Sequence, residues 1–198
     1  MMRGDMSSVR AFLAIPLPQQ LKDSIKALQG NLRAQIPDAR WVRPENLHLT
    51  LYFFGEVEQE TLEKIKDTVL SVKGCKQPFL VEVKGLGAFP NRLQPRVLWL
   101  GLEPKDQLRQ LYEIFRELLQ HAGVATESRP YSPHLTIGRL RQHKTNSTGL
   151  TELNNRVGSK LMGRFSVNSL VLFKSLLQPG GAEHVPLLTV DLDETNNL

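Results

Sequence analysis

The sequence predicts an α+β protein that forms one domain with two similar halves, and three observations lead to this fold class. First, 198 residues are enough for a single domain that buries a sizeable core. Second, strand-like and helix-like patterns are mixed along the chain, with no low-complexity segment and no clear linker. Third, a shift of 86 residues places the strand and helix starts of the first half on those of the second, without gaps. We therefore expect residues 1–198 to form one domain with an internal duplication.

In the first half, the patterns predict two helices between three strands. Strands are expected at residues 9–15, 47–54 and 79–83, and helices at residues 18–32 and 61–72. Pro18 opens the first helix, because the fixed backbone angle of proline suits the first helical turn. The apolar residues of both helices recur every three or four positions, which is the spacing of one buried face. Gly55 is expected to close the second strand, and the segment 85–95, which contains glycine and proline, is expected to be a loop.

In the second half, strands are expected at residues 96–102, 132–140, 165–173 and 185–192, and helices at residues 104–122 and 150–162. Pro104 opens the longest helix, and Gly123 ends it because glycine readily adopts the left-handed conformation after a last turn. The polar segment 141–148 is expected to be a loop.

The similarity between the halves is strongest around a tripeptide that contains histidine. Under the 86-residue shift, five identities fall within eight positions, because Arg43-Pro44 meets Arg129-Pro130 and His48-Leu49-Thr50 meets His134-Leu135-Thr136. The element starts match as well. We interpret this as two copies of a strand–helix–strand unit, related by a pseudo-twofold axis, each with a sheet face that the other copy covers.

Each tripeptide is expected on a strand, where alternate side chains point to opposite faces. The histidine and threonine therefore share one face, and the leucine between them points into the core. A pseudo-twofold axis would make the two imidazole–hydroxyl pairs face each other across a central cleft. From the composition, two His-Leu-Thr units would arise by chance in about one such sequence in a thousand. The pair therefore indicates one shared site formed by His48, Thr50, His134 and Thr136.

Two histidines and two hydroxyls match the needs of phosphodiester cleavage. The attacking oxygen needs a base and the departing oxygen needs an acid. Imidazole has a pKa of about 6.5 and can therefore serve as either near neutral pH. The hydroxyls can donate to the non-bridging phosphate oxygens and stabilise the charge of the transition state. A metal site is less favoured, because each motif offers one good ligand and no nearby Asp or Glu completes the set. The chain also lacks the Gly-x-Ser-x-Gly, Gly-x-Gly-x-x-Gly and Walker patterns.

At these residues the sequence resembles the 2H phosphoesterase superfamily, which is named for its two His-x-Thr-x motifs. Within it, the sequence is similar to the RNA 2′,3′-cyclic phosphodiesterases, also called the bacterial and archaeal 2′-5′ RNA ligase family. The segments that carry the resemblance are RAFLAIPLP, RWVRPENLHLTLYFFGEV, GLGAFPNRLQPRVLWLGL, RPYSPHLTIGRL and, near the end, VLFKSLLQPGGAEHVPL. One position departs from the family, which often has tyrosine where His184 stands; His184 could itself contact a ligand.

The resemblance implies a bilobal fold in which two antiparallel sheets, related by the pseudo-twofold axis and flanked by helices, surround a central cleft. It implies hydrolysis of an RNA 2′,3′-cyclic phosphate to a 2′-phosphomonoester, without a metal or other cofactor, so the partner is RNA or a nucleotide with that cyclic end. By position, His48 becomes the proton donor, His134 the proton acceptor, and Thr50 and Thr136 the phosphate ligands; the pseudo-symmetry leaves an exchange of the two histidine roles open. Two other functions stay open: a 2′-5′ RNA ligase that joins tRNA halves, and a non-catalytic nucleotide-binding module.

The remaining candidates for substrate binding are Arg43, Tyr52, Arg129, Tyr131 and Arg139. Arg43 and Arg129 are equivalent under the shift and could attract a phosphate. The two tyrosines could stack on a base, and strand alternation places Tyr52, but not the other, on the face of its histidine. Alternation places Arg139 on the face opposite the second histidine unless a bulge intervenes.

Composition adds limits on partners and compartment. The formal net charge of +5 favours polyanionic partners, although charge of this size also serves solubility. Cys75 is the only cysteine, which excludes an intrachain disulfide and fits a reducing compartment. No apolar run approaches the ~20 residues needed to cross a bilayer, and the first residues lack the pattern of a signal peptide. We expect a cytoplasmic protein with no membrane partner, and a monomer.

Overall fold

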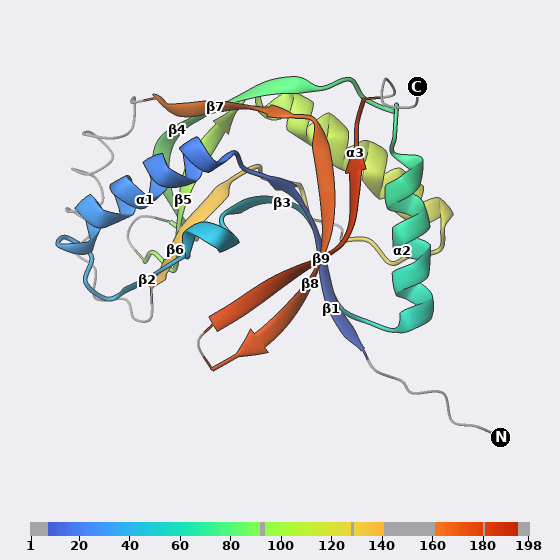
Figure 1. The fold of residues 1–198 in the computed structure, drawn as a ribbon, viewed down its shortest axis with the longest axis horizontal. Coiled ribbons are helices and arrows are strands. Elements are labelled where there is room, and N and C mark those ends of the chain that lie inside the picture. The colour runs from blue at the N-terminus through green and yellow to red at the C-terminus, as the bar shows by residue number, and fades with distance from the viewer. Residues whose placement is uncertain (1–7, 92–93, 128, 141–160, 180, 194–198) are drawn as a thin grey trace.

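The computed structural model describes residues 8–91, 94–127, 129–140, 161–179 and 181–193. Over these residues it shows two antiparallel sheets and three α-helices, which confirms the α+β class (Figure 1). The four-stranded sheet has the order β3 (His48–Val57), β1 (Val9–Pro16), β8 (Ser169–Gln178), β9 (Gly181–Asp191). The five-stranded sheet has the order β2 (Ala39–Trp41), β6 (Leu135–Leu140), β5 (Val97–Glu103), β4 (Phe79–Phe89), β7 (Leu161–Val167). The helices are α1 (Gln19–Arg33), α2 (Gln59–Ser71) and α3 (Lys105–His121), with a short 3-10 helix, η1 (Pro44–Asn46).

The two sheets are built around the same arrangement of strand, helix and strand. β1 is followed by α1 and pairs with β3, and β5 is followed by α3 and pairs with β6. In each sheet two further strands continue beyond the first strand of this pair, namely β8 and β9 beside β1, and β4 and β7 beside β5. The strand orders of the two sheets therefore match, apart from β2 at one edge of the second.

Each helix of these two arrangements covers the sheet of the other. α1 follows β1 but packs on β7, and its buried Gln29 side chain donates to the carbonyl oxygens of Val42 and of Ile137 in β6, both at 2.9 Å. α3 follows β5, but its Tyr112 stacks on Tyr52 of β3, and α2 beside it packs on β1, β8 and β9. Figure 1 shows α1 on one side, over the five-stranded sheet, and α2 and α3 on the other. Separating the sheets would expose the apolar face of each helix, so the exchange holds them together.

The apolar faces meet in one core that runs through both sheets. The residues that α1 buries include the set expected from the spacing: Leu21, Ile25, Leu28 and Leu32. Leu49 and Leu135, the middle residues of the two tripeptides, have 0% exposed area. Each motif strand therefore packs on one side, which leaves the neighbouring histidine and threonine for the opposite face.

Two glycines do not end strands where the sequence predicted ends. The loop expected at 85–95 is wrong in its first part, because β4 continues to Phe89. Gly87 can lie within a strand because its cross-strand neighbour Trp99 lies over it and fills the space of the missing side chain. β3 likewise continues past Gly55, whose φ of 73° accompanies a register shift in the pairing with β1.

The C-terminal elements also differ from expectation. The helix expected at 150–162 is wrong for its last two residues, which begin β7, and the rest of it lies outside the described residues, as does the loop expected at 141–148. The single strand expected at 165–173 is split at Asn168 between β7 and β8. Residues 165–173 are extended on both sides of Asn168, so the local residue pattern did not show that they belong to two strands.

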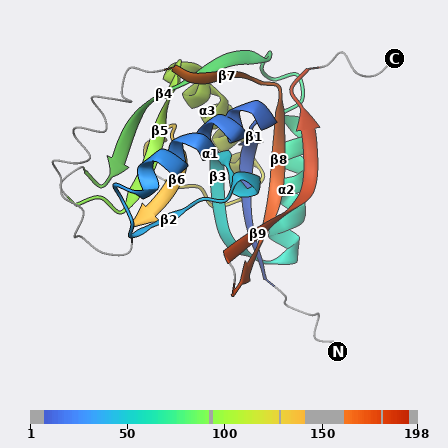
Figure 2. The same ribbon diagram turned by 60° about the vertical axis from the view of Figure 1, so that its left-hand side comes forward.

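β2, which the sequence did not predict, determines how the chain enters the first motif. Its three residues pair with β6 in the five-stranded sheet, and the chain then passes through η1 into β3 of the other sheet (Figure 2). The segment before His48 therefore bridges the two sheets. Within the described ranges, no helix is long and apolar enough to cross a membrane.

Candidate active site

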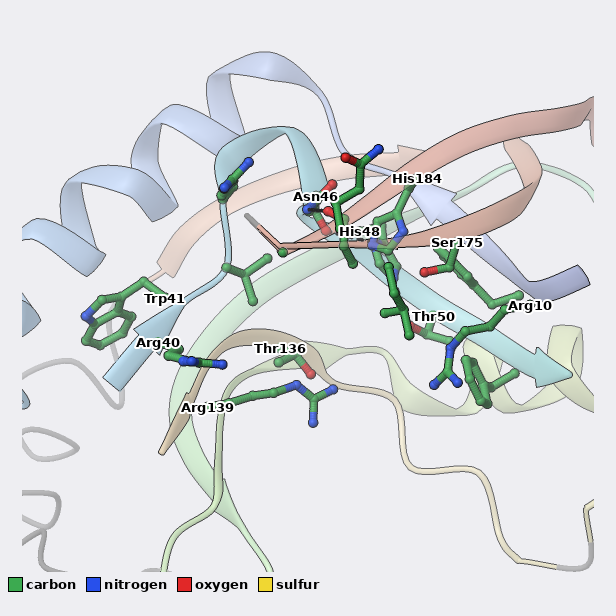
Figure 3. A pocket seen from close by; sticks show the side chains of 18 of the residues that line it. Arg10, Arg40, Trp41, Asn46, His48, Thr50, Thr136, Arg139, Ser175 and His184 are labelled. Carbon is green, nitrogen blue, oxygen red and sulfur yellow. Dashed lines mark hydrogen bonds between the residues drawn. The ribbon is translucent and has the colours of Figure 1, made fainter. Parts of the chain in front are cut away.

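A pocket of about 900 Å³ lies between the two sheets. Most of its lining residues come from β1, β3, β8 and β9 of one sheet and from β2 and β6 of the other, and the rest come from α1, η1 and connecting segments. His48, Thr50 and Thr136 all line it (Figure 3). The half-buried His134 is not among the lining residues, although it lies directly before β6, two residues before Thr136. The structure thus brings three of the four motif side chains to one pocket, and the fourth, His134, lies directly before the strand that supplies Thr136.

The two motif histidines are held in the same way by a backbone carbonyl two residues earlier. His48 Nδ1 lies 2.8 Å from the carbonyl oxygen of Asn46, and His134 Nδ1 lies 2.8 Å from that of Ser132. A carbonyl only accepts, so each Nδ1 carries the proton and each neutral ring keeps its lone pair on Nε2. On His48 this Nε2 accepts from the Thr50 hydroxyl at 3.1 Å. Asn46 and Ser132 are themselves 86 residues apart, so the sequence relation extends to the atoms that set the tautomer.

His48 is strongly biased toward its neutral form. Burial is the main cause and lowers its pKa from 6.5 to about 4; the nearby His184 and Lys22 lower it further, and the Asn46 carbonyl opposes them. The pKa of His134 is also lowered, mainly by burial and then by Arg139, against the effect of the Ser132 carbonyl. In the ligand-free protein both rings are therefore expected to be neutral at pH 7. A bound anion would favour the charged form of either ring and raise its pKa.

His184 is a third imidazole in the pocket. Its ring lies 5.3 Å from the ring of His48, edge to face, and 4.8 Å from that of Phe12, on which His48 also stacks at 4.8 Å. Its Nδ1 is buried without a hydrogen-bond partner in the structure, and burial lowers its pKa. The ligand contact considered for His184 from the sequence is thus compatible with its position on the pocket wall.

The pocket is strongly cationic. Five of its lining residues are arginines, namely Arg10, Arg33, Arg40, Arg43 and Arg139, and none of the described residues that line it is an aspartate or glutamate. Arg10 makes a long ion pair with Glu56 outside the lining, at 3.8 Å, and lies over the ring of Phe53. Such a group of positive charges raises the local concentration of anions and stabilises a bound phosphate.

A bulge follows the threonine in both motifs. In the β1–β3 pairing, Ala14 is opposite Thr50 and Leu13 is opposite Tyr52, so Leu51 has no partner. In the β5–β6 pairing, Trp99 is opposite Thr136 and Leu98 is opposite Gly138, so Ile137 has none. An extra residue in one strand reverses the alternation of all side chains that follow it.

This reversal places Arg139 and Tyr52 on the faces opposite to those that simple alternation predicts. Arg139 lies beyond the bulge and lines the pocket. The sequence analysis placed it on the face of the second motif only if a bulge intervened, and the bulge at Ile137 meets this condition. Tyr52, expected on the face of His48, instead points into the core with 4% exposure, and its hydroxyl accepts from the backbone N–H of Glu127 at 2.9 Å. Its ring stacks on Tyr112, which leaves it no contact with the pocket.

Tyr131 also belongs to this aromatic stack and not to the pocket. Its ring lies 4.6 Å from that of Tyr112, nearly parallel, and burial raises its pKa. Its hydroxyl donates to the carbonyl oxygen of Thr50 at 2.9 Å, across the two halves of the chain. Tyr131 therefore joins the segment before the second motif to the strand of the first, and the base stacking considered from the sequence does not fit this position.

The two equivalent arginines have different surroundings. Arg43 lines the pocket, near Gly181. Arg129 is exposed and is not among the lining residues. Although the two arginines are equivalent under the 86-residue shift, only Arg43 lines the pocket.

Sequence reasoning missed several lining residues, among them Arg40, Asn46 and Ser175. Asn46 could have been noticed, because it is equivalent to Ser132 under the shift and precedes its histidine by the same two residues. Its side chain also donates to the carbonyl oxygen of Ala182 in β9 at 2.7 Å. Arg40 could not be identified as a lining residue from the sequence, because the strand that carries it, β2, was not predicted. In the described part of the chain, no three His, Cys, Asp or Glu side chains gather as metal ligands would.

The family model for LigT-like phosphoesterases matches residues 15–99 and 100–182. The chain belongs to this family. The first matched segment contains His48 and the second contains His134, and the resemblance seen in the sequence is confirmed. This LigT-like phosphoesterase is 35% identical over 173 residues to the RNA 2′,3′-cyclic phosphodiesterase of Methanothermobacter thermautotrophicus, covering 87% of this chain and 93% of that protein. It is 38% identical over 136 residues to the protein of the same name from Thermotoga maritima, covering 68% of this chain and 72% of that one.

Solved structures share the fold of this LigT-like phosphoesterase. The crystal structure of TT0787 of Thermus thermophilus has a TM-score of 0.78 at 26% identity and covers 92% of this chain and 97% of that one. E. coli LigT complexed with 3′-AMP has a TM-score of 0.73 at 26% identity and covers 94% and 99%.

Proposed function

We propose that this LigT-like phosphoesterase hydrolyses RNA 2′,3′-cyclic phosphate ends to 2′-phosphomonoesters, by acid–base catalysis with two histidines and without a metal. The observation that carries the proposal is the pair of His-Leu-Thr strands beside one arginine-lined pocket, with both Nδ1 atoms bound to backbone carbonyls. The names of the two relatives support the substrate class, and the 3′-AMP complex of E. coli LigT supports the binding of a nucleotide.

In the proposed reaction, water attacks the phosphorus and the bond from phosphorus to the 3′ oxygen breaks. His134 Nε2 takes the proton of the water, and protonated His48 gives its Nε2 proton to the departing 3′ oxygen, which becomes a hydroxyl. The opposite assignment of the two histidines uses the same atoms. The hydroxyls of Thr50 and Thr136 donate to the non-bridging oxygens, where charge grows in the transition state. The pocket arginines stabilise the same charge and repel a divalent cation.

The protonation of His48 fits this scheme only when the anionic substrate is bound. Its pKa of about 4 in the free protein leaves about one ring in a thousand charged at pH 7. The negative charge of the bound phosphate raises that pKa, so that the ring can be protonated in the complex. Because burial still lowers the pKa of the ring, its protonated form readily gives the proton to the departing oxygen.

The test is product analysis on a short RNA that ends in a 2′,3′-cyclic phosphate, with and without EDTA. We expect a 2′-monophosphate product in both cases, and a loss of about 10²- to 10⁴-fold in His48→Ala and in His134→Ala. His121→Ala, which removes an exposed histidine at the end of α3, is the matched control. Near-normal turnover in either motif variant would defeat the two-histidine mechanism. Binding without product would favour a nucleotide-binding module, and net joining of RNA halves would favour the ligase.

We also propose that the protein acts as a cytoplasmic monomer. Cys75 is free and exposed, and a reducing compartment would keep its thiol unoxidised. Analytical sedimentation at micromolar protein concentration tests whether the protein is a monomer.

A further inference from the structure

We infer that Gln29 and Tyr131 are positioning residues for catalysis, because each holds the bulge of one motif strand against the segment that leads into the other motif. Neither side chain lines the pocket. The inference rests on the proposed function and goes beyond it, since it assigns the relative placement of His48 and His134 to two side chains outside the catalytic group.

The two bulges are the places where the motif strands need support from outside the ladder. The first bulge, at Leu51, directly follows Thr50, and the second bulge, at Ile137, directly follows Thr136. A bulge interrupts the regular pairing of a strand with its neighbour. Backbone carbonyls at a buried bulge therefore depend on hydrogen bonds from other parts of the chain.

The first bulge is held from the second half of the chain. The Tyr131 hydroxyl donates to the carbonyl oxygen of Thr50 at 2.9 Å, and Tyr131 lies only three residues before His134. A second hydrogen bond joins the same two segments, because the backbone N–H of Glu127 donates to the Tyr52 hydroxyl at 2.9 Å. The strand of the first motif is thus fixed at two points to the segment that leads into the second.

The second bulge is held from the first half in the same manner. The carbonyl oxygen of Ile137 accepts from the Gln29 side chain at 2.9 Å and from the backbone N–H of Val42 at 3.0 Å. Gln29 also donates to the carbonyl oxygen of Val42, at 2.9 Å, and Val42 lies six residues before His48. Figure 2 shows α1, which carries Gln29, lying over β6. Each motif strand is therefore joined to the segment that precedes the other motif.

The surroundings of both side chains restrict their movement. Gln29 is only 3% exposed, and a buried amide that loses its partners pays the full cost of its desolvation. The ring of Tyr131 stacks on Tyr112 at 4.6 Å, and Tyr112 stacks in turn on Tyr52 at 5.6 Å. These contacts hold each donor at its carbonyl, so neither hydrogen bond can stretch without disturbing the core.

The proposed reaction depends on the distance that these hydrogen bonds control. One histidine must reach the attacking water while the other reaches the departing oxygen of the same phosphate, and the two motifs belong to different sheets. Reacting atoms need to approach within about 3 to 3.5 Å, and a misplacement of about 1 Å can cost about a hundredfold in rate. A small shift of one sheet against the other would therefore slow the reaction.

The experiment removes each hydrogen bond without removing a group of the pocket. Tyr131→Phe keeps the stacked ring and loses only the hydroxyl, and Gln29→Met keeps the chain length and loses both N–H donors. Hydrolysis of a short RNA 2′,3′-cyclic phosphate is measured at 25 °C, after urea unfolding curves have shown that each variant is folded there. We expect kcat to fall about tenfold in each variant and KM to change less than threefold, because binding uses the groups of the pocket while proton transfer depends on their spacing.

The imidazole NMR signals of the two motif histidines give a readout that needs no turnover. Tyr131 is close in sequence to His134 but bonds to the strand of His48, so Tyr131→Phe should shift and broaden the ring signals of His48. Gln29→Met should do the same to the ring signals of His134, whose strand it holds.

The control separates positioning from stability alone. Val69→Ala removes buried methyl groups from α2, where Val69 has 0% exposure. It should lower the urea midpoint as the two test variants do, but leave kcat within twofold and both sets of ring signals unchanged.

A lower urea midpoint in Tyr131→Phe with unchanged kcat and unchanged His48 signals would overturn the positioning role. Tyr131→Phe decides the question by itself if Gln29→Met does not fold. The proposed function fails separately, if the wild type releases no 2′-monophosphate, and in that case the ring signals still decide whether the two side chains position the motifs.

Discussion

Mild acid should destabilise this protein in part through one half-buried ring, that of His48. Its pKa is about 4 in the folded protein and about 6.5 when the chain is unfolded. Between these values the unfolded chain binds more protons than the folded one, so the stability that His48 contributes is complete above pH 6.5 and is lost as the pH falls toward 4. At 1.36 kcal/mol per pH unit, the loss is about 2 kcal/mol at pH 5 and about 3 kcal/mol by pH 4.

The assay is urea unfolding of the wild type and of His48→Gln at pH 7.5 and pH 5. Effects of pH on groups that do not interact with His48 are common to both proteins, so the difference between them reports the titration of His48 together with its coupling to His184. We expect the wild type to lose about 2 kcal/mol more than the variant between the two pH values. His121→Gln, which changes an exposed histidine, should follow the wild type. Equal losses in the wild type and His48→Gln would refute the argument that burial holds this ring neutral.

Three further predictions concern the supports of the site. Tyr131→Phe removes the donor to the Thr50 carbonyl and should lower the free energy of unfolding by about 1 to 2 kcal/mol, measured in urea. Gly87→Ala would push a Cβ into the ring of Trp99 and should cost about 1 to 3 kcal/mol. Because that ring also contacts His134, turnover should fall as well, and unchanged turnover would show that the contact is not needed. Sulfate should raise the melting temperature more at pH 5.5 than at pH 8, relative to chloride at equal ionic strength, because a bound anion favours charged imidazoles; an effect independent of pH would contradict this.

Much of the fold could be predicted because it follows from short-range geometry. The period of a helix and the alternation of a strand are properties of the local backbone, so the buried faces of α1 and α3 and the strands of both motifs were visible in the residue pattern. β2 and the Gly85–Phe89 part of β4 were not, since three residues carry no period and a glycine in a strand depends on its neighbour across the sheet.

The candidate site divides in the same way. The repeated tripeptide indicated one shared site, and three of its four polar side chains line one pocket. The candidates beyond the threonines depended on the bulges at Leu51 and Ile137, which arise from pairing with β1 and β5. These bulges bring Arg139 to the pocket and take Tyr52 away from it, and no property of either residue alone would show this.

By itself, then, the sequence determined which chemical groups are available and that they occur twice, because identity and spacing are written in the chain. Only the tertiary structure decided which of them meet. The pairing register, the crossing of the chain from β2 to β3 and the exchange of α1 and α3 between sheets are all contacts between distant segments. Contacts of that kind place Arg40 opposite Arg139 and hold His48 half-buried and neutral.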